Sequence, residues 1–184
     1  MSIYRDRRVR RIVTATRDDG RSYVETEELL PGGAAVEGRV RAVLWRTDEA
    51  PARNDASEER SEDAGVPPPG SGGTIAILVD IPPREEIPRL SLDDLLSRGL
   101  HATADRHARH PLFHASDTLD YCLCVDGETH VLLDEGEIHL RAGDVLIQRG
   151  TQHAWDNRSG GPCRMLFVLI DAHPLPGDHP AAAP

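Results

Sequence analysis

The chain has 184 residues, an ordinary length for one domain with a single core. Its 31 acidic and 21 basic residues give a formal charge of −10, and such a surface repels phosphate backbones, so we expect no nucleic-acid partner. No apolar run reaches membrane-spanning length and no signal segment opens the chain, so we expect a cytoplasmic protein without a membrane partner. All the basic residues are arginine, which excludes Schiff-base chemistry and the lysine of a phosphate-binding loop.

The first half of the chain is irregular, and we assign residues 1–73 to N-terminal strands followed by a loop. Within residues 47–73, acidic residues, proline, glycine and serine dominate, a composition typical of a mobile loop. After it, Ser91 opens a capping-box pattern, and Gly99 closes a short predicted helix. Apolar patterning predicts strands in this half and just after it over residues 11–16, 22–25, 36–45 and 74–81.

The second half reads as a regular succession of short strands separated by glycine turns. Asp126-Gly127 is a favoured hairpin turn, and further turns follow at intervals typical of a sandwich or barrel. Residues 173–184 are rich in proline and alanine, and we expect them to be disordered. The predicted strands of this half are 119–125, 128–133, 137–140, 145–148, 153–157 and 163–170.

The segment from Gly143 to Asn157 carries the most informative pattern. Side chains two apart on a strand face the same way, so His153, Trp155 and Asn157 are expected to share one wall. The segment resembles the second sequence motif of the cupins, which keeps Gly150, His153 and Asn157, although Gln148 stands where the usual motif has proline. The resemblance covers residues 74–172.

The first cupin motif is degenerate in this chain. Its usual form, His-x-His followed by Glu and Gly, maps onto His114, Ser116 at the second histidine, Asp120 at the glutamate, and Gly127. The resemblance implies an all-β fold, the cupin-type double-stranded β-helix or jelly-roll barrel. Extra N-terminal strands and one short helix would be added to that barrel.

A usual cupin metal site holds three histidines and a glutamate, and the resemblance offers a reduced version. His114, Asp120 and His153 are candidates for a two-His-one-carboxylate face, the arrangement that binds ferrous iron, with zinc, manganese and nickel as alternatives. Serine is a poor ligand for such metals. The competing hypothesis is that no metal binds.

Without a metal, the same three residues form an acid–base set. Histidine changes charge near neutral pH, and a carboxylate nearby orients it or takes a proton itself. Trp155, Cys122 and Cys124 would supply an apolar wall to a small-molecule substrate. We assign substrate binding to Trp155, Asn157, Gln148, Cys122, Cys124 and Ser116, and we expect Tyr121, one residue after Asp120, to point outward.

Cys122 and Cys124 alternate on one predicted strand. Three cysteines in all make no disulfide framework, and free cysteine is usually a small buried hydrophobe. The alternative is that the thiolates of Cys122 and Cys124 bind a soft metal.

Three functions remain open at this stage. The first is an enzyme that performs acid–base chemistry on an organic metabolite, as single-domain cupins resembling this chain do: dehydration, isomerisation, decarboxylation or cyclisation. The second is a non-haem iron dioxygenase, and the third is a metabolite-binding cupin without catalysis. We favour the first. Because cupins commonly pair through N-terminal strands, we also expect a homodimer.

Overall fold

The computed structural model describes residues 7–30, 35–36, 39–54, 69–87, 110 and 112–175. The expected helix over residues 91–99, the centre of the expected loop and most of the expected tail lie outside these described residues. Within the described part of the chain, no helix is long and apolar enough to cross a membrane.

Strands account for nearly all the regular structure that is described, as the sequence predicts. Each predicted strand appears, with ends that differ by a few residues, and the strand expected over residues 36–45 divides into two. The elements are β1 (Val9–Thr16), β2 (Ser22–Leu30), β3 (Ala35–Val36), β4 (Arg39–Thr47), β5 (Thr74–Ile81), the 3-10 turn η1 (Arg84–Glu86), β6 (Thr118–Asp126), β7 (Glu128–Leu133), β8 (Glu137–Arg141), β9 (Val145–Arg149), β10 (His153–Asp156) and β11 (Cys163–Asp171).

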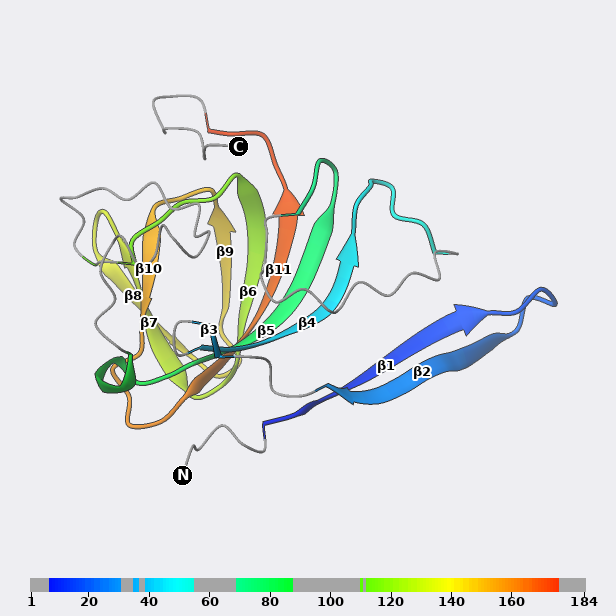
Figure 1. Cartoon of the computed structure of the whole chain (residues 1–184). Helices are drawn as coiled ribbons and strands as arrows, with labels where there is room; N and C mark the ends of the chain where they lie inside the picture. Colours follow the sequence, from blue (N-terminus) through cyan, green and yellow to red (C-terminus); the bar gives the residue numbers. More distant parts are fainter. Residues whose placement is uncertain are drawn as a thin grey trace.

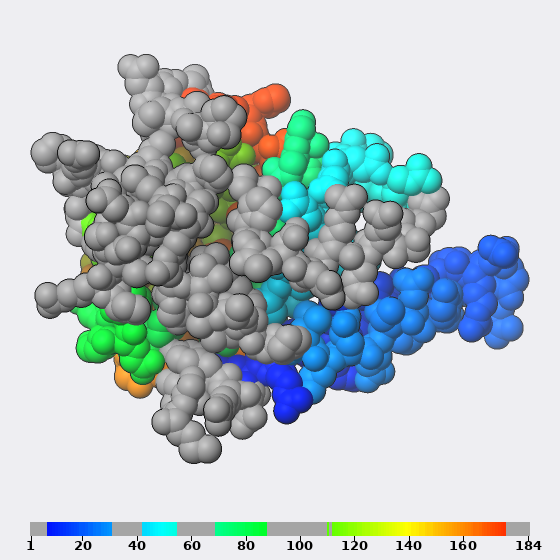
Figure 2. All heavy atoms as spheres, viewed as in Figure 1, coloured from blue at the N-terminus to red at the C-terminus, as the bar shows by residue number. Residues whose placement is uncertain are grey.

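Two sheets face each other in a jelly-roll arrangement (Figure 1). The larger has six strands in the order β3-β4-β5-β11-β6-β9, and the smaller has three in the order β10-β7-β8. The expected boundary at residue 73 falls between β4 and β5, which pair along their length, so the larger sheet continues across it. The hairpin of β1 and β2 pairs with neither sheet and projects from the body of the molecule (Figures 1 and 2).

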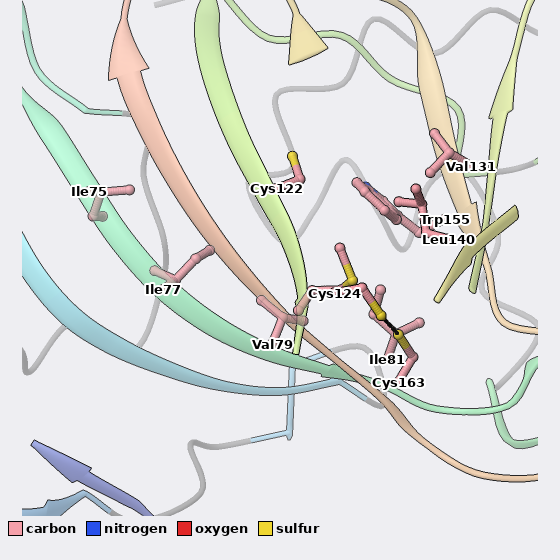
Figure 3. Packing of buried hydrophobic residues seen from close by; sticks show 11 residues of the cluster. Ile75, Ile77, Val79, Ile81, Cys122, Cys124, Val131, Leu140, Trp155 and Cys163 are labelled. Atoms are coloured by element: carbon pink, nitrogen blue, oxygen red, sulfur yellow. Dashed lines mark hydrogen bonds between the residues drawn. The ribbon is translucent and has the colours of Figure 1, made fainter. Parts of the chain in front are cut away.

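The core lies between the two sheets, and it is built by strict alternation along the strands. On β5, Ile75, Ile77, Val79 and Ile81 face inward, and β11 adds Cys163 and Met165. The smaller sheet closes the core with Trp155, Val131 and Leu140, which lie together on the other side of Figure 3.

Alternation on β6 decides which way the central site residue points. Thr118, Asp120, Cys122 and Cys124 are buried, whereas Tyr121 between them is 48% exposed. The prediction that Tyr121 points outward is therefore confirmed. Asp120 occupies an inward position of the same kind as the two cysteines, so a carboxyl group lies among the apolar side chains of the core.

Gly150 forms the turn that joins β9 to β10. Its φ of +62° lies in the left-handed region, and a Cβ there would lie 3.2 Å from the main-chain oxygen of Ser116. Glycine at this position therefore permits the tight turn, and it also lets the segment before β6 pack closely against that turn. Both segments carry site residues.

Candidate functional site

Two histidines from distant parts of the chain are held together by their main chains. His114, just before β6, and His153, at the start of β10, form an isolated antiparallel bridge. Each amide N–H donates to the other's carbonyl oxygen at 2.9 Å. Their rings lie 4.3 Å apart between centroids and are tilted by 49°. The structure therefore brings together the two histidines that the sequence motifs predicted, and it does so with rigid backbone contacts.

Each ring contacts a main-chain carbonyl through Nδ1. Nδ1 of His114 lies 2.8 Å from the oxygen of Leu112, and Nδ1 of His153 lies 2.9 Å from the oxygen of Thr151. A carbonyl oxygen only accepts, so a proton on Nδ1 of His114 satisfies that contact and leaves the lone pair of the neutral ring on Nε2. Nδ1 of His153 also contacts the side-chain amide of Gln148, so a partner is present for either tautomer of that ring.

The spacing of the rings also limits their charge. Two unit positive charges 4.3 Å apart repel by roughly 4 kcal/mol at an effective dielectric constant of about 20. Placing a positive charge on both rings at once therefore costs more than placing one on either ring.

Asp120 is buried on β6 and is only 6% exposed. Burial raises the pKa of its carboxyl group from 3.8 to about 6, although a hydrogen bond with Thr118 lowers it in part. Its Oδ1 atom is buried and has no hydrogen-bond partner among the described residues. A carboxyl group that changes charge near neutral pH is suited to accepting or delivering a proton.

Gln148 contacts the histidine pair from the strand beside Asp120. It lies directly opposite Asp120 in the register of β6 and β9. Its Nε2 atom contacts Nδ1 of His153 and lies 3.5 Å from the oxygen of Thr151, and its buried Oε1 atom has no hydrogen-bond partner within the described part of the chain. We predicted substrate binding for Gln148, but its contact with a histidine ring could not be read from the spacing.

An aromatic wall borders the histidines. The Trp155 ring meets the His153 ring edge-on with centroids 6.0 Å apart, and it meets Phe167 of β11 in the same manner at 5.1 Å. Cys122 follows Asp120 on the inner face of β6. Burial, and then the charge of Asp120, raises the pKa of the Cys122 thiol to about 12. It is therefore a thiol at neutral pH and contributes apolar surface, as expected of a buried cysteine.

Two residues that we assigned to substrate binding have other roles. The Asn157 amide donates to the carbonyls of Ile81 and Gly161, and its oxygen accepts from Ser159. It stabilises the turn after β10, because that strand ends at Asp156 and the side chain no longer follows the alternation. Cys124 lies in the core, 3.7 Å from Cys163 between sulfur atoms (Figure 3).

Ser116 remains near the site. Its hydroxyl lies 2.8 Å from that of Thr118, and Thr118 in turn is hydrogen-bonded to Asp120. The serine that replaces a metal-binding histidine in the usual motif thus belongs to a chain of hydroxyl groups that leads to the carboxyl group.

The outer side of the smaller sheet carries a network that sequence analysis missed. Asp156 of β10 is fully buried and accepts hydrogen bonds from Arg84 and Arg158. Arg158 also pairs with Glu137 at 2.8 Å. Burial raises the pKa of Asp156, but the two arginines outweigh burial, so its pKa is lowered overall. The network clamps the segment after β5 onto the strand that carries His153 and Trp155.

Comparison with known families agrees with this geometry. The cupin domain model matches residues 101–169, a span that contains both histidines and Asp120. The chain thus carries a cupin domain over these residues.

This cupin has relatives among fungal biosynthetic proteins. It is 46% identical over 66 residues to phomopsin biosynthesis cluster protein C′ of Diaporthe leptostromiformis, a match that covers 35% of each chain. It is 28% identical over 135 residues to the cupin-domain-containing oxidoreductase srdD of Neurospora crassa, covering 70% of this cupin and 57% of that protein. These matches span about a third and just over half of the relatives' lengths.

Among solved structures, a putative ethanolamine utilization protein Q from Salmonella typhimurium shares 13% identity with this cupin. The TM-score is 0.45, and the alignment covers 90% of this cupin and 98% of that chain.

The residues that this cupin offers do not fit the metal centre of the usual motif. Two imidazoles with Nε2 lone pairs are suitable donors for a divalent metal. Among the described residues, however, no group of three or more His, Cys, Asp and Glu side chains is placed to hold a metal ion. His114, Asp120 and His153 therefore do not form a three-donor face in this structure.

Proposed function

We propose that this cupin is an enzyme that moves protons on a small organic metabolite, in a dehydration, isomerisation, decarboxylation or cyclisation. The observation that carries the proposal is the bridged pair of His114 and His153. Their rings lie 4.3 Å apart between centroids, each Nδ1 contacts a main-chain carbonyl, and a positive charge on both rings costs more than a charge on one. A pair of this kind supplies an acid and a base on one side of a substrate.

Asp120 gives the site a second proton carrier. With a pKa of about 6, the carboxyl group is largely ionised at pH 7 and takes up a proton at mildly acidic pH. The neutral imidazole removes a proton from the substrate, the protonated imidazole returns one, and Asp120 adjusts the charge between turnovers. Trp155 and Cys122 restrict water around the reacting atoms, which strengthens these electrostatic interactions.

Two other functions give different outcomes in one experiment. The Neurospora crassa relative is named a cupin-domain-containing oxidoreductase, which favours an oxidation, and that chemistry would require a metal with an open position for oxygen. A protein that binds a metabolite without catalysis is the third function. Asp120 disfavours it, because burying a carboxyl group with one oxygen unpartnered among the described residues is costly unless catalysis uses that group.

The test is a panel of hydroxy, keto and carboxylic substrates, incubated in D2O with and without added iron. Proton chemistry predicts isomerised or decarboxylated products that carry solvent deuterium, or dehydrated or cyclised products identified by mass spectrometry, formed at the same rate without iron and without consumption of oxygen. Iron-dependent oxygen consumption would instead support the oxidoreductase. Binding of panel compounds with neither outcome would support the binding protein and refute the proposal.

We also propose that two copies of the chain pair. Tyr121, Val145 and Ile147 form an exposed apolar strip on the outer face of β6 and β9. Ile12 and Leu29 are exposed on the projecting hairpin, which pairs with neither of the other two described sheets. A second copy would bury both surfaces. A dimeric mass by light scattering that becomes monomeric in Ile147→Glu is expected, and a monomeric wild-type protein would contradict the proposal.

A further inference from the structure

Three side chains that carry a hydroxyl or carboxyl group stand at alternate positions where β6 begins. Ser116, Thr118 and Asp120 follow one another at intervals of two residues, the spacing that places side chains on one side of an extended chain. Thr118 is 3% exposed and Asp120 is 6% exposed, whereas Ser116 is only partly buried. The row therefore leads from a partly exposed serine to a buried carboxyl group.

Hydrogen bonds connect the three side chains. The hydroxyl groups of Ser116 and Thr118 lie 2.8 Å apart, and either can donate to the other. The side chain of Thr118 is also hydrogen-bonded to the carboxyl group of Asp120. Because a hydroxyl group both donates and accepts, it can pass on its own proton while it takes up another. The three groups therefore form a continuous path for a proton.

The main chain holds this row in place from both sides. The N–H of Gly150 donates to the carbonyl oxygen of Thr118 at 3.1 Å, and the N–H of Ala172 donates to the carbonyl oxygen of Asp117 at 3.2 Å. The segment before β6 is thus tied to the turn before β10 and to the residue that follows β11. The contact between the two hydroxyl groups is therefore built on a fixed backbone.

The neighbours of Asp120 within its own sheet offer no comparable route. Asp120 lies opposite Leu169 of β11 and Gln148 of β9, and neither of these side chains titrates. The next inward residue of β6 is Cys122, whose pKa of about 12 keeps it a thiol at neutral pH. Within this sheet, the hydroxyl groups are thus the groups suited to bring a proton to the carboxylate.

We infer that Ser116 and Thr118 relay the proton that Asp120 gains and loses. When Asp120 takes up a proton, Thr118 transfers its hydroxyl proton to the carboxylate and receives one from Ser116, which receives one from water. Loss of the proton runs the same transfers in reverse, so each hydroxyl group ends with one proton and only the direction of its hydrogen bond changes. Both residues act through Asp120 and are positioning residues. The inference rests on the proposed function, in which Asp120 adjusts the charge of the site between turnovers.

The experiment follows the protonation of Asp120 in the protein without substrate. A light-activated acid lowers the pH from about 7 to about 5, and the infrared band of the protonated carboxyl group is recorded with time. The band that is missing in Asp120→Asn belongs to Asp120. We expect Ser116→Ala to slow the appearance of this band at least about tenfold, without moving the midpoint of its equilibrium titration, because the serine does not touch the carboxyl group. An unchanged rate would overturn the inference, since the proton would then arrive directly from water or through the histidine pair.

Variants of Thr118 separate the relay from the shape of the side chain. Thr118→Val keeps the shape and removes the hydroxyl group, so we expect a similarly slow rate together with a higher pKa of Asp120, because the hydrogen bond that lowers it is lost. Thr118→Ser should restore the rate. Thr129→Val removes a buried hydroxyl group from β7 and should keep the wild-type rate.

A wild-type rate in Thr118→Val, or a Thr118→Ser as slow as Thr118→Val, would overturn the inference. Ser116→Ala decides the outcome if Thr118→Val does not fold. No turnover is measured in these experiments, so a failure of the relay would leave the proposed function standing, and that function has its own test in the products formed with and without iron.

Discussion

Asp120 makes a quantitative prediction about stability and pH. The pKa of its carboxyl group rises from 3.8 to about 6 on folding because the group is buried. Ionising it therefore costs more in the folded than in the unfolded protein, by roughly 3 kcal/mol when the difference in pKa is converted to free energy. Well below pH 3.8 the group is protonated in both states and carries no penalty. The penalty grows as the pH rises through the interval between the two pKa values and is complete above the folded value.

The variant Asp120→Asn isolates this effect because it removes the ionisation and keeps the shape. We expect the stability of the variant relative to wild type to increase by up to about 3 kcal/mol between pH 3.5 and pH 8. The measurement is urea unfolding of both proteins at five pH values, since contributions of the other carboxyl groups cancel in the difference. A difference that is flat with pH would show that Asp120 ionises as it does in water. A difference that decreases with pH would show that the carboxylate is stabilised, and either result would refute the electrostatic account of the site.

Two further predictions concern the framework around the site. In urea unfolding, Asp156→Asn should lower the free energy of unfolding by about 2–3 kcal/mol, because it leaves Arg84 and Arg158 without their buried charged partner. The control Glu137→Gln, at the exposed end of the network, should lower it by less than about 1 kcal/mol. Equal losses in the two variants would contradict the role of the network as a clamp. The thiols of Cys122, Cys124 and Cys163 are fully buried, and burial raises the pKa of each. They should therefore react with Ellman's reagent only after unfolding, and rapid reaction of the native protein would show that the core opens.

Much of the fold follows from local patterns. Alternating apolar residues and glycine turns placed the strands of the second half to within a few residues, because each hairpin joins strands that are neighbours in sequence. Local patterns do not determine the order of strands in the sheets. β6, for example, pairs with β9 on one side and β11 on the other, and both pairings depend on how the whole chain packs.

The sequence predicted the site residues that stand at motif positions, but it did not predict contacts between residues that are distant in the sequence. His114 and His153 stood at motif positions, and their proximity is confirmed. Asn157 also stood at a motif position, but its strand ends one residue earlier and the side chain stabilises a turn instead. The pair of Arg84 and Asp156 joins residues 72 apart, and an arginine after a proline carries no signal of such a partner.

The most direct test of proton transfer by the histidine pair is the rate of the deuterium-incorporating reaction in two matched variants. His153→Ala removes one ring of the pair, whereas His139→Ala removes a histidine that stacks on His130 on the outer side of the smaller sheet. The account predicts that His153→Ala loses at least about a hundredfold in turnover with the fold intact by circular dichroism, and that His139→Ala retains the wild-type rate. Wild-type turnover in a folded His153→Ala would contradict it.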